Sequence, residues 1–141
     1  MNSLSLQVYI NFDGNCREAV EYYSKVFKTD KPEIMTFGDA PEDPGFSLPE
    51  ESKNLVMHTQ LIISGDIVMF SDTFPGMPLV KGNNISLTVV TDDMDEITEA
   101  FNQLKAEGKV EMDLQETFWS KYYGSVVDKY GITWQFSMYE H

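Results

Sequence analysis

The sequence predicts an α+β fold built from two tandem βαβββ modules. Strand-like and helix-like segments follow one another in the same order in both halves of the 141-residue chain. Asn15 and Asp93, which precede the two predicted helices, are 78 positions apart, and the same offset carries Tyr23 onto Phe101. Because strand, helix start and apolar stripe all repeat at one offset, the chain is expected to be an internal duplication of a unit of about 75 residues.

The first half opens with a β-branched and aromatic segment at residues 6–12, which predicts a strand. Apolar residues then recur at helical spacing and predict a helix over about residues 15–28. Asn15 and Glu18 form a capping-box-like pair, in which the Asn15 side chain accepts from a free backbone N–H at the helix start. Three more strands are predicted at residues 33–37, 55–64 and 66–72, the last two joined by a Ser64-Gly65 hairpin turn.

The second half repeats this arrangement. Residues 84–91 predict a strand, and Asp93 with Glu96 predicts the start of the second helix. Gly108 follows that helix at the place where a left-handed C-terminal cap is expected. The remaining strands are predicted at residues 109–115, 123–128 and 133–139.

Length and composition favour one folded domain over residues 1–141, since 42% of the residues are hydrophobic and 13% are aromatic. Within it the first module spans residues 4–73, the second spans residues 84–139, and residues 74–83 form a linker. The loop at residues 38–54, rich in Pro, Gly and acidic residues, is either a pocket lid or a solvated insertion.

The charge balance excludes two classes of partner. Ten basic against 23 acidic side chains give a formal net charge of -13. A nucleic acid or an anionic membrane surface needs clustered Lys and Arg, so neither partner is expected. The single cysteine, Cys16, cannot form an internal disulfide, and no signal peptide or membrane-length apolar run is found, so a cytoplasmic protein is expected.

Four segments carry a family likeness. They are YINFDGNCREAVEYYSKVF at 9–27, MHTQLIISG at 57–65, VMFSD at 68–72 and QETFWSKYYGSVVDKYGITWQF at 115–136. On these segments the chain resembles the PhnB-like (YjdN-type) proteins of the vicinal oxygen chelate superfamily. That superfamily includes glyoxalase I, extradiol dioxygenases and the fosfomycin and bleomycin resistance proteins.

The resemblance implies two curved sheets around a U-shaped trough, in a protein that forms a homodimer. In the metal-dependent members, His and Glu side chains from the first and last strands of each module hold one divalent cation, which substrate oxygens chelate. Some PhnB-like sequences are labelled as ubiquinone-pathway methyltransferases. The present sequence has no glycine-rich loop for S-adenosylmethionine, so it does not support methyl transfer.

The positions that the resemblance assigns to metal ligands hold none of the usual ligands. Gln135, four residues after the hairpin residue Gly131, stands where the metal enzymes keep a carboxylate. A neutral amide adds no charge to a metal site. No cofactor is therefore expected, and a divalent metal is the disfavoured alternative. The other positions fall on Val8 or Gln7, on Ser86 or Ile85, and on Val68, Met69 or Phe70.

Neutral polar and aromatic side chains remain as candidates to line a site for a small organic molecule. Because strand residues alternate between two faces, only part of this set can face inward. Glu116 and His58 are the candidate catalytic residues, and Asp128, a possible acid–base partner of Glu116, most simply opens the last hairpin turn. The candidate ligand-binding residues are Tyr9, Asn11, His58, Gln60, Ser71, Phe118, Trp119 and Gln135.

Three functions follow from these residues. The favoured one is binding of a small organic molecule in the trough without the usual metal centre. The second is a metal-dependent lyase, isomerase or dioxygenase that uses unconventional ligands such as His58, Gln135 and Glu116. The third is a dimeric structural subunit whose own side chains fill the trough.

Overall fold

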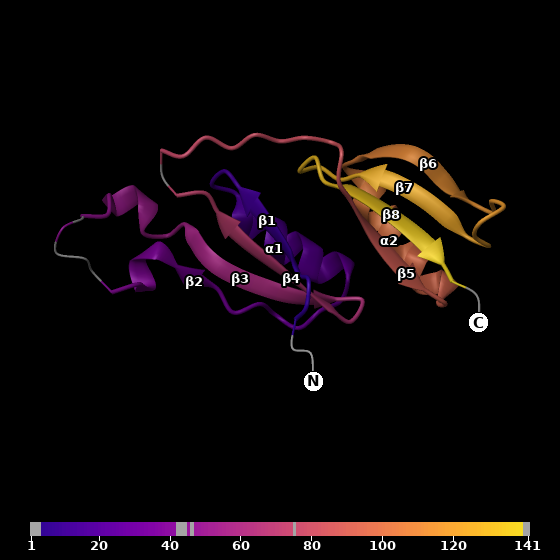
Figure 1. Cartoon of the computed structure of the whole chain (residues 1–141), viewed down its shortest axis with the longest axis horizontal. Coiled ribbons are helices and arrows are strands. Elements are labelled where there is room, and N and C mark those ends of the chain that lie inside the picture. Colours follow the sequence, from indigo (N-terminus) through magenta and orange to yellow (C-terminus); the bar gives the residue numbers. More distant parts are fainter. Residues whose placement is uncertain (1–3, 42–44, 46, 75, 140–141) are drawn as a thin grey trace. The chain divides into compact units, whose positions relative to one another are not determined.

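The chain divides into two compact units, residues 1–79 and 80–141, and the boundary lies inside the predicted linker. The structure is a computed structural model that describes residues 4–41, 45, 47–74 and 76–139. Each unit contains a four-stranded mixed sheet and an α-helix (Figure 1). The predicted α+β fold with two βαβββ modules is confirmed.

In the first unit the strand order is β1-β4-β3-β2, with β1 and β4 parallel and the other neighbours antiparallel. β2 has only two residues and an irregular register against β3. The loop predicted at 38–54 holds short 3₁₀ turns at Phe37–Asp39 and Glu50–Ser52, while its residues 42–44 and 46 lie outside the described residues. The elements are β1 Val8–Phe12, α1 Cys16–Val26, β2 Met35–Thr36, β3 Val56–Ile63 and β4 Asp66–Asp72.

The second unit has the equivalent order β5-β8-β7-β6, again with its first pair parallel. Both β5 and α2 begin 78 residues after β1 and α1, which is the offset read from the sequence. The same topology at the same offset supports the internal duplication. The elements are β5 Ser86–Thr91, α2 Met94–Ala106, β6 Lys109–Gln115, β7 Tyr123–Val127 and β8 Thr133–Met138.

Each helix covers one face of its own sheet. In the first unit the buried Tyr23 of α1 stacks on Phe70 of β4, with ring centroids 5.8 Å apart. In the second unit Phe101 of α2 meets Phe136 of β8 edge-on at 6.2 Å. Because strand side chains alternate, the residues between these core positions point to the opposite face of each sheet, called the open face below.

The predicted cap of the first helix is wrong. Asn15 occupies the N-cap position, but its side chain makes no capping hydrogen bond. Instead the buried carboxylate of Asp72, at the end of β4, accepts from Cys16 N at 2.9 Å and from Val56 N at 2.9 Å. A carboxylate from a neighbouring strand therefore binds the free N–H group at the helix start. In α2 the predicted cap is confirmed, since Asp93 accepts from Glu96 N at 3.1 Å.

The predicted left-handed cap at Gly108 is also wrong, because Gly108 is not among the glycines with positive φ. Glycine is needed there for close packing: a Cβ atom would meet the carbonyl oxygen of Val127 and would lie 2.6 Å from that of Leu104. The two predicted hairpin turns are confirmed by positive φ at Gly65 and Gly131.

Candidate functional site

The open face of the first sheet brings together five of the predicted ligand-binding residues. Strand register pairs Tyr9 and Gln60 with Met69, pairs Asn11 with Ser71, and pairs His58 with Met35 on β2. Paired residues share a face of the sheet. Tyr9, Asn11, His58, Gln60 and Ser71 therefore lie on one face, opposite α1.

Two local contacts organise this face. The hydroxyl of Ser71 donates to Asn11 Oδ1 at 3.0 Å, and Ser71 is buried. The rings of Tyr9 and His58 lie 5.9 Å apart, and Tyr9 is 45% exposed. The face therefore presents aromatic and neutral polar groups to solvent.

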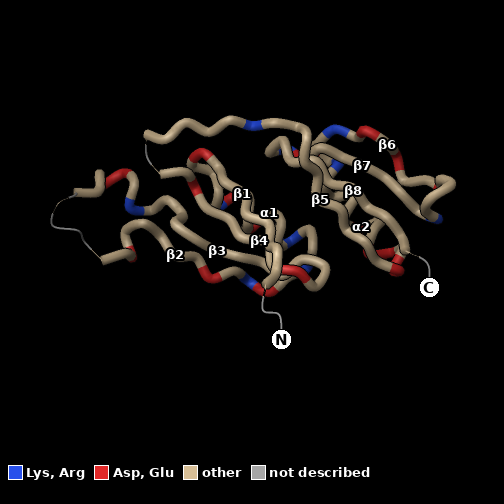
Figure 2. Tube along the Cα trace, viewed as in Figure 1, with Lys and Arg blue, Asp and Glu red and all other residues tan. Residues whose placement is uncertain are grey.

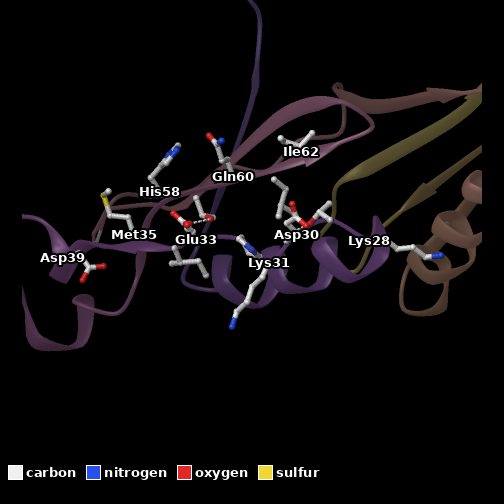
Figure 3. Close-up of a pocket in the computed structure, with 14 residues that line it drawn as sticks. Lys28, Asp30, Lys31, Glu33, Met35, Asp39, His58, Gln60 and Ile62 are labelled. Carbon is white, nitrogen blue, oxygen red and sulfur yellow. Dashed lines mark hydrogen bonds between the residues drawn. The ribbon is translucent and has the colours of Figure 1, made fainter.

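A groove of about 870 Å³ lies at the β2 edge of this sheet (Figure 3). His58, Gln60 and Ile62 project from β3 on one side, as Figure 3 shows. The opposite side is the segment 28–35, which pairs with β3 only at its end because β2 is short. Thr59 Oγ1 spans the two sides with a hydrogen bond to Glu33 O at 2.7 Å. The sequence did not predict that segment 28–35 lines a groove, because residues 33–37 have the pattern of an ordinary paired strand.

The open face of the second sheet carries a hydrogen-bonded chain centred on Gln135. Gln135 Nε2 donates to Ser86 Oγ at 2.7 Å, and Tyr123 OH donates to Gln135 Oε1 at 2.5 Å. Each polar end of the amide thus makes one hydrogen bond and keeps a second donor or acceptor position, and all three side chains are half-buried. Tyr123 is absent from the predicted site, although pairing the last two strands around the Gly131 turn would have placed it on the face of Gln135.

The residues at the expected ligand positions do not fit a divalent metal ion. In the second unit those positions hold Ser86 and Gln135, which are hydrogen-bonded to each other. In the first unit Val68 and Phe70 lie on the helix-covered face, and the open-face alternative is the thioether of Met69. Transition metals in such sites bind imidazole, carboxylate or thiolate. Within the described part of the chain, no three His, Cys, Asp or Glu residues come together in a way that would hold a metal ion.

The candidate acid–base residues lie in different settings. Asp128 is buried, and its carboxylate accepts from Tyr130 N at 2.8 Å, Ile132 N at 3.1 Å and Trp134 Nε1 at 2.9 Å. Those bonds hold the last hairpin turn together. Glu116 is exposed on the segment that follows β6. The chain has one histidine besides His58, and this residue, His141, lies outside the described residues.

Cys16 is fully buried at the start of α1. Burial raises the pKa of its thiol to about 12; the negative charge of Asp72 adds to this rise and Arg17 opposes it. Since the thiolate is the nucleophile, a thiol with this pKa is unreactive at neutral pH.

Phe118 and Trp119, the two remaining predicted ligand-binding residues, lie on the segment between β6 and β7. Phe118 is 97% exposed and Trp119 is 53% exposed. Trp119 lies edge-on to Tyr123 with ring centroids 5.4 Å apart. The structure therefore connects these aromatics to Gln135 through Tyr123.

Acidic positions are spread over both units rather than gathered on one element (Figure 2). Lys and Arg are fewer, in keeping with the net charge of -13. Among the residues that the structure describes, no helix has the length and apolarity needed to span a membrane.

Comparison with known proteins identifies the family. A family model described as 3-demethylubiquinone-9 3-methyltransferase matches residues 5–137. The chain belongs to this family. Protein YjdN from Escherichia coli strain K12 is 31% identical over 146 residues, which cover 96% of this chain and 95% of YjdN. The predicted membership of the PhnB-like (YjdN-type) family is therefore confirmed.

Solved structures agree with this family and with the fold. Protein PA1353 from Pseudomonas aeruginosa is 31% identical, with a TM-score of 0.83 covering 99% of this chain and 100% of that one. A glyoxalase/bleomycin resistance protein/dioxygenase family enzyme from Burkholderia phytofirmans is 11% identical, with a TM-score of 0.61 covering 94% and 95%. The second likeness concerns the fold alone, and it places this PhnB-like chain in the glyoxalase/bleomycin resistance/dioxygenase fold.

Proposed function

We propose that this PhnB-like protein binds a small organic molecule on the open faces of its sheets, without the usual metal centre. The observation that carries the proposal is the Gln135 chain. An amide held between Ser86 and Tyr123 offers directed, uncharged hydrogen-bonding groups where a metal enzyme would need charged ligands. Methyl transfer, which the description of the family names, is not the function proposed.

The first unit supports the same function. Its groove of about 870 Å³ falls within the range of small-molecule sites, and His58 and Gln60 reach it from the open face. Such sites combine apolar walls with a few placed polar groups. Ile62 and Met35 are the exposed large apolar residues that line the groove.

A ligand screen tests this function. Thermal unfolding of the purified protein is measured with a broad library of neutral, cationic and anionic small molecules. A ligand at 100 times its dissociation constant stabilises the folded state by about 2.7 kcal/mol, which raises the melting temperature visibly. If no compound in the library stabilises the protein, the proposed function is wrong.

The compounds that stabilise the protein are then tested on two variants. Gln135→Leu removes the central amide of the open face and is expected to abolish stabilisation by ligands of the second unit. Asn102→Leu changes an exposed polar residue of α2, on the helix side of the sheet, and should leave binding unchanged.

Metal content tests the metal-free part of the proposal. Protein purified without chelators is expected to contain no stoichiometric transition metal by elemental analysis. Added Zn²⁺, Ni²⁺ or Mn²⁺ is expected not to raise its melting temperature. One equivalent of metal that is lost in the His58→Ala variant would favour a metal-dependent enzyme with unconventional ligands.

We also propose that the protein is a cytoplasmic homodimer. The support is the family resemblance for the dimer and the single, buried Cys16 for the compartment. Sedimentation velocity over a range of concentrations tests the dimer, and a monomer at every concentration would exclude it.

A further inference from the structure

The most exposed aromatic side chains of the second unit lie together on one short turn. Phe118 is 97% exposed, Trp119 is 53% exposed, and their rings meet edge-on with centroids 4.7 Å apart. Residues 117–120, called the aromatic turn below, carry both. Adjacent exposed aromatics of this kind usually mark a contact surface, because water solvates them poorly.

The backbone of the aromatic turn is fixed by several hydrogen bonds. Thr117 N donates to Ser120 O at 2.9 Å, and Ser120 N donates to Thr117 Oγ1 at 3.1 Å. The buried Ser120 hydroxyl lies 3.0 Å from Tyr122 O, which accepts from it, and it accepts from Met138 N of β8 at 3.2 Å. The turn is therefore held to the sheet, and Phe118 and Trp119 are presented without a large ordering cost on binding.

The aromatic turn continues into the polar chain of the open face. Trp119 contacts Tyr123 edge-on, and the Tyr123 hydroxyl donates to Gln135 Oε1. Aromatic rings and the Gln135–Ser86 pair thus form one connected surface. A ligand that covers it needs a flat apolar body and at least one hydrogen-bonding group.

The net charge of the protein indicates which charge a ligand should carry. With a net charge of -13 the molecule as a whole attracts cations and repels anions. Phe118, Trp119, Tyr123, Gln135 and Ser86 are themselves uncharged, and the exposed residues Glu116 and Lys121, of opposite charge, flank the turn. A cation additionally gains from an aromatic face.

We propose that the aromatic turn selects planar aromatic ligands that are neutral or cationic, with Trp119 and Phe118 stacking on the ring system. This inference rests on the proposed function and names the ligand class of its second-unit site. Phe118 and Trp119 determine specificity, while Tyr123 and Gln135 bind the polar group of the ligand.

Three probes of one ring system test the ligand class. Binding of 9-aminoacridine, acridone and acridine-9-carboxylate is measured by calorimetry, with cyclohexylamine as a cation that lacks an aromatic ring. We expect 9-aminoacridine and acridone to bind and the carboxylate and cyclohexylamine to bind at least tenfold more weakly. Equal affinity for 9-aminoacridine and cyclohexylamine would overturn the proposal, because charge alone would then explain binding.

The two tryptophans give an internal comparison. In a ¹⁵N–¹H spectrum the indole signal of Trp119 is expected to shift on adding acridone. The signal of Trp134, which is 1% exposed and bound to Asp128, is expected to stay in place. An unmoved Trp119 signal in the presence of bound acridone would overturn the proposal.

Variants separate this inference from the proposed function. Trp119→Ala and Phe118→Ala are each expected to weaken acridone binding about tenfold, and Trp119→Phe much less. Tyr139→Ala, another exposed aromatic of the same unit, serves as the matched control. Because both turn residues are exposed, the fold should persist, and an unchanged Trp134 indole signal verifies it.

The possible failures are distinguishable. If the library screen finds ligands but both alanine variants bind them as the wild type does, the aromatic turn does not select the ligand and only this inference falls. The same holds if the variants change the sedimentation coefficient and leave probe binding intact, since the pair is then a protein contact. If neither the screen nor the acridine probes bind, the proposed function falls with the inference.

Discussion

At the scale of single residues, two buried carboxylates organise the backbone. Asp72 binds the first N–H groups of α1 and β3, and Asp128 binds two N–H groups of the last turn and the Trp134 indole. A buried charge is tolerated when several donors solvate it. Of the two, the sequence predicts only the turn role of Asp128, because its partners are local and those of Asp72 are 56 and 16 residues away.

Replacement of Asp128 tests this role. Asp128→Asn keeps the size of the side chain but turns one oxygen into an NH₂ group that faces N–H donors. We expect a loss of about 3 kcal/mol in the free energy of unfolding, measured by urea denaturation. Asp113→Asn on the exposed surface of β6 is the control and should change stability by less than about 0.5 kcal/mol. A loss no larger than that of the control would contradict the structural role.

The buried thiol of Cys16 gives a second prediction. Its pKa is raised from an ordinary value of 9.0 to about 12, so at pH 8 the folded protein holds roughly 1000-fold less thiolate than the unfolded chain. Native protein should therefore react with a disulfide reagent very slowly, and protein in 8 M urea rapidly. Comparable rates in the two states would show that the thiol is accessible.

The same thiol links stability to pH. Below pH 9.0 the thiol is protonated in both states, so its contribution to stability is complete. Above pH 9.0 the unfolded chain releases the proton first, and stability falls as pH rises toward about 12. The urea midpoint is expected to fall less steeply between pH 8.5 and 10.5 in Cys16→Ala than in the wild type. Equal slopes would contradict this linkage.

At the scale of the elements, the two helices start differently despite their matched sequences. Asp93 caps α2 with its own side chain, whereas α1 takes its cap from Asp72 and leaves the Asn15 side chain unused. Asp93→Ala should therefore cost about 1 kcal/mol of unfolding free energy. Asn15→Ala should cost less than about 0.5 kcal/mol by the same urea measurement. Equal losses would mean that Asn15 caps its helix after all.

Close packing at a helix end gives another test. A Cβ atom at Gly108 would overlap two carbonyl oxygens, that of Val127 at the end of β7 and that of Leu104 in the last turn of α2. We expect Gly108→Ala to destabilise the protein by about 2 kcal/mol through overpacking. Gly82→Ala is the control, because its Cβ would meet only the Asn84 side chain at 3.4 Å. A Gly108→Ala variant as stable as the control would contradict the packing.

At the scale of the whole molecule, the acidic balance should govern stability in salt. A net charge of -13 makes the folded chain repel itself, and salt screens that repulsion. We expect the melting temperature at pH 7 to rise between 10 mM and 300 mM NaCl. Near pH 4.3, where the net charge vanishes, the dependence on salt should disappear. A melting temperature that falls with NaCl at pH 7 would show that attractive ion pairs dominate.

The secondary-structure elements and their duplication could be predicted from the sequence. The β-branched and aromatic segments and the helical spacing are local, so they predicted the strands and helices that the described residues form. The repeat at 78 residues predicted one topology used twice. The family likeness, carried by motifs such as residues 115–136, was also accessible from the sequence. The family likeness located the metal-ligand positions in the sequence, and the residues at those positions are uncharged.

The contacts between side chains of distant segments could be seen only in the folded protein. Strand register joined Gln135 to Ser86 across 49 residues and Asn11 to Ser71 across 60 residues. In the folded protein Asp72, rather than Asn15, caps α1, and a groove lies beside the short strand β2. Such contacts depend on the pairing of distant segments, and the burial of each whole sheet face sets that pairing rather than any local pattern.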